Sequence, residues 1–325
     1  MGTFIIRRLI QTVIVLLVVS FIAFLLLHLI PGDPVVTMLG QEASQAQIEA
    51  LRKELGLNQP LVVQYTRWLM NVLRGDFGKS IIYRENVTDL IVNRLPITFH
   101  LGLIAMILST LISIPAGVIS AVRRGSFLDS IITVSANLGM ATPLFWLGIL
   151  GVYFFSLKLG WLPVQGYTSP FSDFWMNTKQ IIMPSICLAV VPLASLARQT
   201  RSSMLEVIRS DYITTARAKG MSESRVIFRH ALPNALLPVI TVIGNGMGML
   251  LAGAVVIEMI FSIPGVGMYL VGGINTRDYA IVQSSVIFLA IAFATIMLLV
   301  DLAYAFIDPR VKAQFAGQKR RKQRA

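Results

Sequence analysis

Long apolar stretches constrain this chain more than any other feature. Six of them are long enough for a helix to cross a bilayer, which takes about 20 mainly apolar residues. Charged residues make up only 14% of the 325 residues, whereas a typical soluble domain carries about 25%. The sequence therefore predicts an all-α membrane protein with six transmembrane helices. We place these spans at about 9–30, 97–121, 131–157, 181–197, 235–257 and 285–307.

The first apolar stretch is expected to remain part of the protein. Arg7 and Arg8 precede it, as basic residues precede the apolar region of a secretory signal peptide. The stretch is too long for such a region, however, and no small-x-small cleavage site follows it. We therefore interpret it as a retained transmembrane helix.

Basic residues predict on which side of the membrane the two ends lie. Six spans place both termini on the same side. If that side is the cytoplasm, the cytoplasmic segments hold 18 of the 28 lysines and arginines. Most of the others lie in one long outer loop, which is translocated largely regardless of its charge. We therefore expect cytoplasmic N- and C-termini.

This arrangement divides the chain into four regions. The last of them, the basic tail at 311–325, would suit the anionic inner leaflet of a membrane. A basic end without a specific role is an equal alternative. The regions are an N-terminal transmembrane helix (1–30), an extracytoplasmic segment (31–95), a transmembrane core of five helices (96–310) and a basic cytoplasmic tail (311–325).

The extracytoplasmic segment is predicted to contain two short helices. A turn at 31–34 (PGDP) ends the first span. Residues 44–55 form the first helix, with Ser44 as its N-cap and Gly56 as its stop, and residues 60–74 form the second. The segment is too small and too polar for an enzyme domain, so a lid or a docking surface is expected.

Residues typical of catalysis or metal binding are scarce. The sequence Gly78-Lys79-Ser80 looks like the end of a phosphate-binding loop, but Leu73 stands where that loop needs its first glycine. Cys187 is the only cysteine, and the three histidines lack metal-ligand spacing. No Ser/His/Asp set, HExxH or CxxC occurs. We predict no catalytic, cofactor-binding or metal site, and a protein that is not an enzyme.

Two carboxylates lie within the expected spans. Glu258 is near the outer end of the fifth span and Asp301 near the inner end of the sixth. An acid inside a membrane is a candidate functional group, either structural or pore-lining. A position near a helix end favours structural partners, such as an arginine or backbone amides. An ion-coupled secondary transporter more often has acids or interrupted helices at the midplane.

The loop between the fourth and fifth spans is predicted to form an elbow, at about 201–232. Residues 202–219 are expected to form one helix, which Gly220 ends in a left-handed conformation. Ser222 then caps a second helix that leads to Pro233. One face of the first helix is apolar, with Leu205, Ile208, Tyr212 and Ala216 at helical spacing. Periodicity leaves two alternatives open: a helix lying on lipid headgroups or a knob that fits a groove on a cytoplasmic partner.

The elbow resembles the cytoplasmic coupling signature of ABC-transporter permease subunits. That signature reads Glu-Ala-Ala, three residues, Gly, nine residues, Ile-x-Leu-Pro. Here Thr214-Thr215-Ala216, Gly220 and His230-Ala231-Leu232-Pro233 stand at the same spacing, and Thr214, Thr215 and His230 depart from it. The departures are similar to the peptide-importer branch, which typically reads Tyr-x-x-Thr-Ala-x-Ala-Lys-Gly, as in Tyr212 to Gly220.

Further stretches along nearly the whole chain resemble the B-type permease of dipeptide, oligopeptide, glutathione and nickel importers. They include HLIPGDP, LRGDFGKS, RQTRSSMLEVIRSDY, GAVVIEMIFSIPGVG and VDLAYAFIDPR. The resemblance implies a multi-pass protein of a bacterial or archaeal cytoplasmic membrane. Its implied partners are a second permease in a heterodimer, two ATP-binding subunits that hydrolyse the ATP, and an extracytoplasmic solute-binding protein.

The resemblance also implies which residues contact the ATP-binding subunits. Residues 31–95 and 261–283 would face the binding protein or the pore mouth, although an ordinary turn at 261–283 is an open alternative. Peptides are the expected substrate, with nickel chelate or glutathione as alternatives. An ion-coupled carrier and a membrane scaffold that moves no solute are the other classes. The expected coupling residues are Asp211, Tyr212, Thr215, Ala216, Arg217, Lys219, Gly220 and Pro233.

Overall fold

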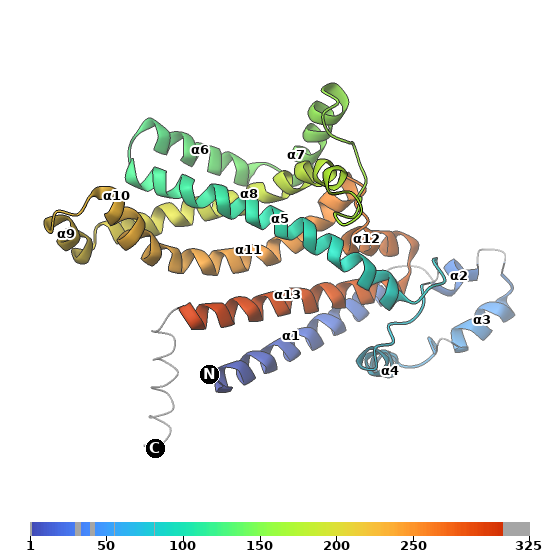
Figure 1. Ribbon diagram of the computed structural model, residues 1–325. Helices are drawn as coiled ribbons and strands as arrows, with labels where there is room; N and C mark the ends of the chain where they lie inside the picture. The colour runs from blue at the N-terminus through green and yellow to red at the C-terminus, as the bar shows by residue number, and fades with distance from the viewer. Residues whose placement is uncertain (1, 30–33, 40–42, 55, 81, 308–325) are drawn as a thin grey trace, which may run out of the picture. The chain divides into compact units, whose positions relative to one another are not determined.

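The chain is helical almost throughout the computed structural model (Figure 1). The structure describes residues 2–29, 34–39, 43–54, 56–80 and 82–307, and at some helix ends it describes the backbone alone. Among these residues there is no β-strand, only an isolated antiparallel bridge between Lys79 and Asn86. The prediction of an all-α chain is confirmed. The expected turn at 31–34 and the basic tail lie largely or wholly outside the described residues.

Five helical segments of the described chain are long and apolar enough to cross a membrane. Four correspond to helices α1 (Gly2–Leu29), α5 (Val87–Val122), α8 (Phe174–Ile208) and α13 (Tyr279–Ile307). The fifth runs without a break through α10 (Glu223–Arg225), the π-helix η2 (Val226–Ala231) and α11 (Leu232–Ile260).

The prediction of one continuous span at 131–157 is wrong. Helix α6 (Phe127–Ala141) ends at Ala141. The following segment, α7 (Leu144–Gly151) continued by the π-helix η1 (Val152–Lys158), is bent by 100° relative to α6. Thr142 at the break has extended backbone angles, φ −83° and ψ 126°. Pro143 explains this conformation, because its ring excludes the preceding residue from the helical region. Counting the bent pair as one span gives six spans.

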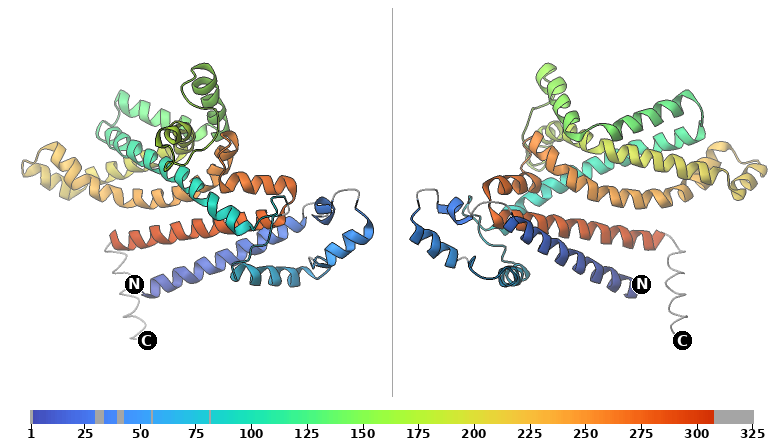
Figure 2. Two further views of the ribbon diagram at one scale, coloured as in Figure 1. Left: turned by 45° about the vertical axis from the view of Figure 1, so that its right-hand side comes forward. Right: turned by 180° about the vertical axis from the view of Figure 1, so that it is seen from behind.

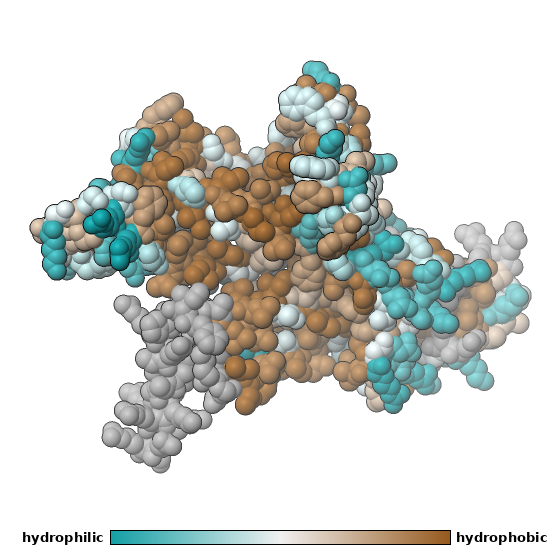
Figure 3. All heavy atoms as spheres, viewed as in Figure 1, coloured by the Kyte–Doolittle hydropathy of each residue, from teal (hydrophilic) through white to brown (hydrophobic). Residues whose placement is uncertain are grey.

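The chain divides into two compact units. The first comprises Met1–Leu9, Phe99–Ile263 and Phe293–Ala325, and the second comprises Ile10–Thr98 and Pro264–Ala292. Within the first unit, α8 packs against α6 and α11, and all three run alongside α5 in both views of Figure 2. Hydrophobic side chains cover these helices in Figure 3, whereas hydrophilic ones gather at the end that carries α9.

Close backbone contact joins α5 to α8 in the first unit. A Cβ atom at Gly117 would lie 2.6 Å from the Cβ of Thr200 and 2.7 Å from the carbonyl oxygen of Ala197. Further along, the Ser109 hydroxyl donates a hydrogen bond of 3.0 Å to the Ala189 carbonyl. Small residues let membrane helices approach closely where the hydrophobic effect gives them no reason to associate.

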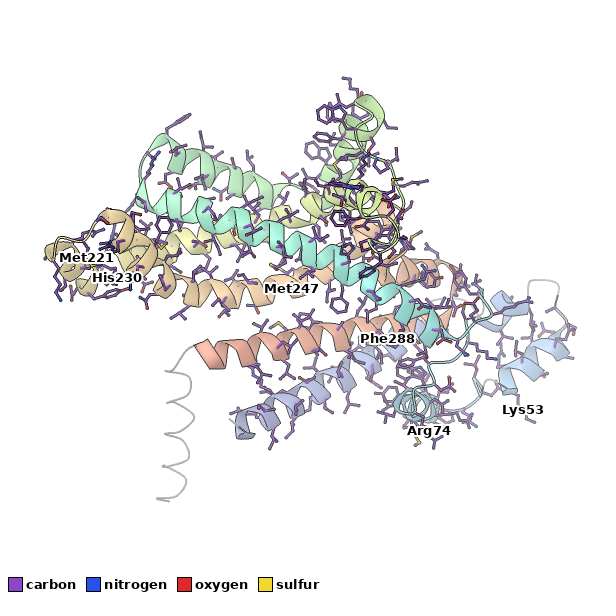
Figure 4. The ribbon with its side chains drawn as sticks, viewed as in Figure 1. Lys53, Arg74, Met221, His230, Met247 and Phe288 are labelled. Carbon is purple, nitrogen blue, oxygen red and sulfur yellow. The ribbon has the colours of Figure 1, made fainter. Side chains whose placement is uncertain are left out.

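The second unit contains α2 (Pro34–Leu39), α3 (Gln45–Glu54), α4 (Leu61–Leu73) and α12 (Val266–Thr276). Both short helices predicted within 31–95 are confirmed as α3 and α4. The Ser44 hydroxyl accepts from the Gln47 amide at 3.3 Å, and the Gln47 side chain accepts from the Ser44 amide at 3.0 Å. This reciprocal pair is a capping box. Gly56, the predicted stop of this helix, has φ +68°. Figure 4 labels Lys53 at the end of α3 and Arg74 just after α4.

The Gly78-Lys79-Ser80 stretch has a structural role in the second unit. The Ser80 hydroxyl donates to the buried Asp278 carboxylate at 2.7 Å, and Asp278 also accepts from the Ile281 amide at the start of α13. Beside this pair, Phe77 packs on Phe288, which Figure 4 labels, with ring centroids 4.8 Å apart. The stretch therefore anchors the end of segment 31–95 to α13.

Replacing Gly117 with Val should weaken the contact between α5 and α8. The added atoms would overlap Thr200 and the backbone of Ala197, so the free energy of unfolding should fall by about 1–3 kcal/mol. Gly102→Val is the matched control, because it lies on the same helix and no atom lies within 4 Å of its Cβ position. Thermal unfolding in detergent measures both, and equal losses would contradict the close contact.

Candidate functional site

The elbow consists of two helical arms joined at Gly220. The first arm is α9 (Asp211–Ala218), and the second is α10 continued by η2. The prediction of one helix over 202–219 is wrong, because α8 ends at Ile208 and α9 starts at Asp211. Ser210 between them has an extended backbone, and its hydroxyl donates to the Val207 carbonyl at 2.6 Å. A serine that bonds back to the preceding turn competes with helix continuation.

Gly220 has the left-handed conformation that the sequence predicts, with φ +75°. Its amide donates to the Arg217 carbonyl at 2.9 Å, which ends α9. No atom lies within 4 Å of the position that its Cβ would occupy. Glycine is therefore favoured at this position by its positive φ, and not by close packing against other parts of the chain. Ser222 precedes α10 as predicted, but its side chain makes no capping hydrogen bond.

An apolar core holds the elbow to the transmembrane helices of the first unit. Ile213 of α9 is fully buried in it, and Met221 packs against it. Figure 4 labels Met221 and His230 at this end of the molecule. The core also draws on α5, α8, η2 and α11, so any displacement of α9 acts on all four. Its buried members are Val118, Ala121, Met204, Ile213, Ala216, Val226, Ile227, Ala231 and Ala235.

The predicted apolar face of α9 is shifted by one residue. Tyr212, expected on this face, is 46% exposed, whereas Ile213 is 0% exposed and packs inward. The cause is the break at Arg209 and Ser210, which interrupts the helical period that relates Leu205 to Tyr212. Ala216, expected on the same face as Tyr212, is 9% exposed. As a buried residue it packs α9 and does not belong to the elbow's surface.

The other expected coupling residues are exposed. Those up to Gly220 are polar apart from Tyr212 and the glycine itself, and Pro233 is exposed at the start of α11, just beyond the second arm. Glu223 accepts two hydrogen bonds from Arg217, at 2.7 and 3.0 Å, which tie the two arms together. The hydrogen bond to Glu223 raises the pKa of the Arg217 guanidinium. The exposed set is Asp211, Tyr212, Thr215, Arg217, Lys219, Gly220 and Pro233.

A surface hollow of about 500 Å³ lies where α8 meets the α5–α6 turn. Arg124, Leu205, Glu206 and Arg209 line it. No sequence motif marks this hollow, because its lining residues come from the α5–α6 turn and from the end of α8, far apart in the chain. Two arginines, one glutamate and a leucine give it a mixed surface with an excess of positive charge.

The structure describes the side chain of Glu258 but not that of Asp301, the other acid within the expected spans. Glu258 is fully buried in the last turn of α11. Asp301 belongs to α13, and its side chain lies outside the described part of the chain. Within that part no group of three His, Cys, Asp or Glu could hold a metal ion, and Cys187 is a buried free thiol. The expected absence of a cofactor stays a prediction.

Long apolar helices, one of them leading into a structured polar elbow, define a multi-pass membrane protein. The family model described as binding-protein-dependent transport system inner membrane component matches residues 113–313. The model for the N-terminal part of such components matches residues 1–102. The chain belongs to this family of transport-system permeases, and it is therefore one component of a larger transport system.

Several curated relatives match over almost their full length. The dipeptide transport system permease DppB of Alkalihalophilus pseudofirmus is 41% identical over 94% of this chain and 98% of its own. The oligopeptide transport system permease AppB of Bacillus subtilis is 41% identical over 96% and 100%. The di/tripeptide transport system permease DppB of Pseudomonas aeruginosa is 40% identical over 97% and 100%.

A solved structure shares the fold. A chain of the MetNI methionine ABC transporter, in an inward-facing conformation, superposes with a TM-score of 0.54. The match covers 67% of this chain and 96% of that chain, at 18% sequence identity. The two chains thus share a fold over this part of the sequence.

Replacing Gly220 with Val should lower the free energy of unfolding by about 1–2 kcal/mol, because an L-residue is strained at its φ of +75°. Gly220→Asn should cost less, because asparagine tolerates the left-handed region. The open space around Gly220 removes any steric difference between the two side chains. Thermal unfolding of the purified chain measures both, and equal losses would mean that φ is not the reason for glycine.

Proposed function

We propose that this chain is one of two permease subunits in an ATP-driven, binding-protein-dependent importer of di- and oligopeptides. The observation that carries the proposal is the near full-length similarity to permeases named for dipeptide, di/tripeptide and oligopeptide transport. Nickel chelate and glutathione are the alternative cargoes. The chain forms the translocation path with the second permease, and ATP hydrolysis takes place on separate subunits.

The proposed topology has six spans with both termini in the cytoplasm. Six spans result if the bent pair α6 and α7–η1 counts as one. The excess of lysine and arginine in the expected cytoplasmic segments supports this orientation. The elbow then lies in the cytoplasm, and α2 to α4 lie outside the membrane on the opposite side. The bacterial inner membrane is the proposed location.

The elbow is the proposed contact with an ATP-binding subunit. Its outer surface is polar and exposed, whereas its inner surface is part of the apolar core shared with α5, α8 and α11. A push on α9 would therefore move the inner ends of these helices. Movement of packed helices as rigid bodies is a common way to exchange two conformations, here inward-facing and outward-facing ones.

The proposed surface for the solute-binding protein lies in the second unit. It uses the expected segments 31–95 and 261–283, of which residues 264–283 belong to this unit. The Ser80–Asp278 hydrogen bond and Arg94 hold these residues to the first segment. The Arg94 guanidinium lies 3.7 Å from the centre of the Tyr269 ring and donates to the Pro264 carbonyl at 3.1 Å. The two segments would therefore present one surface to a docked protein.

The Tyr212→Ala variant should change the function of the elbow's surface without changing the packing of its core. Tyr212 is exposed, so the fold should keep its stability, whereas removing a central aromatic contact should lower peptide uptake and binding-protein-stimulated ATP hydrolysis at least about tenfold. Tyr153→Ala is the matched control, because Tyr153 on η1 is equally exposed at 49%. The assay uses the complete transporter in proteoliposomes. Normal activity of the Tyr212 variant would remove this side chain from the proposed contact.

Deleting the gene should abolish uptake of labelled di- and tripeptides, and the intact gene should restore it. Nickel and glutathione uptake are measured in parallel. Loss of either one with normal peptide uptake would keep the permease assignment and change its cargo. Uptake by the purified chain in liposomes without ATP-binding subunits would instead support an ion-coupled carrier.

A further inference from the structure

A buried carboxylate lies directly behind the elbow. Asp129 in the first turn of α6 has a side chain that is 8% exposed. Arg201 of α8 donates to its two oxygens from Nε and Nη2, at 2.8 and 2.9 Å. The Ser120 hydroxyl of α5 and the Gly125 amide of the α5–α6 turn donate to the same carboxylate, the latter at 2.9 Å. One side chain thus binds α5, the turn and α8 to α6, and we call Asp129 with these three partners the clamp.

The clamp uses the same helical turns as the elbow's core. Ser120 stands between Val118 and Ala121 of α5, which belong to that core. Arg201 lies three residues before Met204 of α8, which is also in it. The elbow therefore packs against the parts of α5 and α8 that Asp129 holds together.

The chemistry of the clamp fixes geometry as well as distance. A planar guanidinium with two parallel bonds to a carboxylate has a defined orientation, and such charge-assisted bonds are stronger than neutral ones. Without Asp129, the α5–α6 turn loses its tie to α8. Gly125 in that turn has φ +78°, and no atom lies within 4 Å of its Cβ position, so nothing packs on the turn at this residue.

We propose that Asp129 is a positioning residue for transport, which locks the inner ends of α5, α6 and α8 so that a movement of the elbow shifts all three together. The proposal rests on the proposed function of the elbow. With the clamp intact, force from α9 reaches α6 through Arg201 and Ser120. With the clamp broken, α5 and α8 still follow the elbow through the apolar core. Helix α6 keeps its packing against α8 but loses the charged tie at its first turn, so this end of α6 follows the movement less closely.

The test is the amount of peptide imported per ATP hydrolysed by the complete transporter in proteoliposomes. Asp129→Asn should lower this ratio about tenfold, within the range of coupling energies between distant sites, while ATP hydrolysis continues. A purely structural role would lower transport and hydrolysis in parallel and leave their ratio unchanged. An unchanged ratio therefore overturns the proposal.

Asp173→Asn is the matched control. Asp173 is also a carboxylate at a helix start, where it accepts from the Met176 amide at 2.9 Å, but it is exposed and caps the opposite end of α8. Its replacement should leave the ratio unchanged. A drop as large as that of Asp129→Asn would show that the loss is not specific to the clamp and would overturn the proposal.

Two further variants keep the test decisive if Asp129→Asn fails to assemble. Ser120→Ala removes one donor without leaving a charge unpaired, and Arg201→Lys keeps the charge but loses the paired bonds. Both should lower the ratio about two- to tenfold, which is the usual size of the effect when a mutation weakens the coupling between two sites, in complexes that assemble normally. A wild-type ratio in both would overturn the clamp. If the wild-type complex itself imports no peptide with ATP, the proposed function fails instead.

Discussion

Water is absent from the interior of a bilayer, so each backbone N–H and C=O there must find its hydrogen-bond partner inside the protein. Long helices meet this requirement within a single segment, and the apolar stretches of this chain fold in that way. Breaks are correspondingly costly, and the breaks here have local causes. At Thr142 the following proline forces an extended backbone, and at Ser210 the hydroxyl satisfies the Val207 carbonyl.

The elbow is a consequence of the second of these breaks. Because α8 stops at Ile208, α9 starts in a new register and turns Ile213 inward and Tyr212 outward. The inner side of α9 then completes an apolar core with α5, α8 and α11. The outer side keeps the exposed polar and aromatic residues that we propose as the contact with an ATP-binding subunit. Beneath it, the carboxylate of Asp129 joins α6 to the same helices.

Local chemistry made some elements predictable from the sequence, and distance made others unpredictable. The N-cap at Ser44 and the left-handed turn at Gly220 each depend on a few adjacent residues, and the sequence predicts both. The bend at Thr142 was missed although Pro143 marks it, because hydropathy averages over such a residue. No glycine or proline marks the break at Ser210, so the shifted face of α9 was missed. Asp129 and Arg201 are 72 residues apart, and no spacing rule connects such a pair.

The one-residue shift in α9 separates two kinds of sequence change. Substitutions at Asp211, Tyr212, Thr215 or Lys219 alter only the outside of the elbow, whereas Ile213 and Ala216 are fixed by the packing beneath them. At the proposed contact, the surface offered to a partner can therefore change while the packing beneath it stays the same. In a cell that makes several transporters of this family, such divergence would let each permease bind its own ATP-binding subunit.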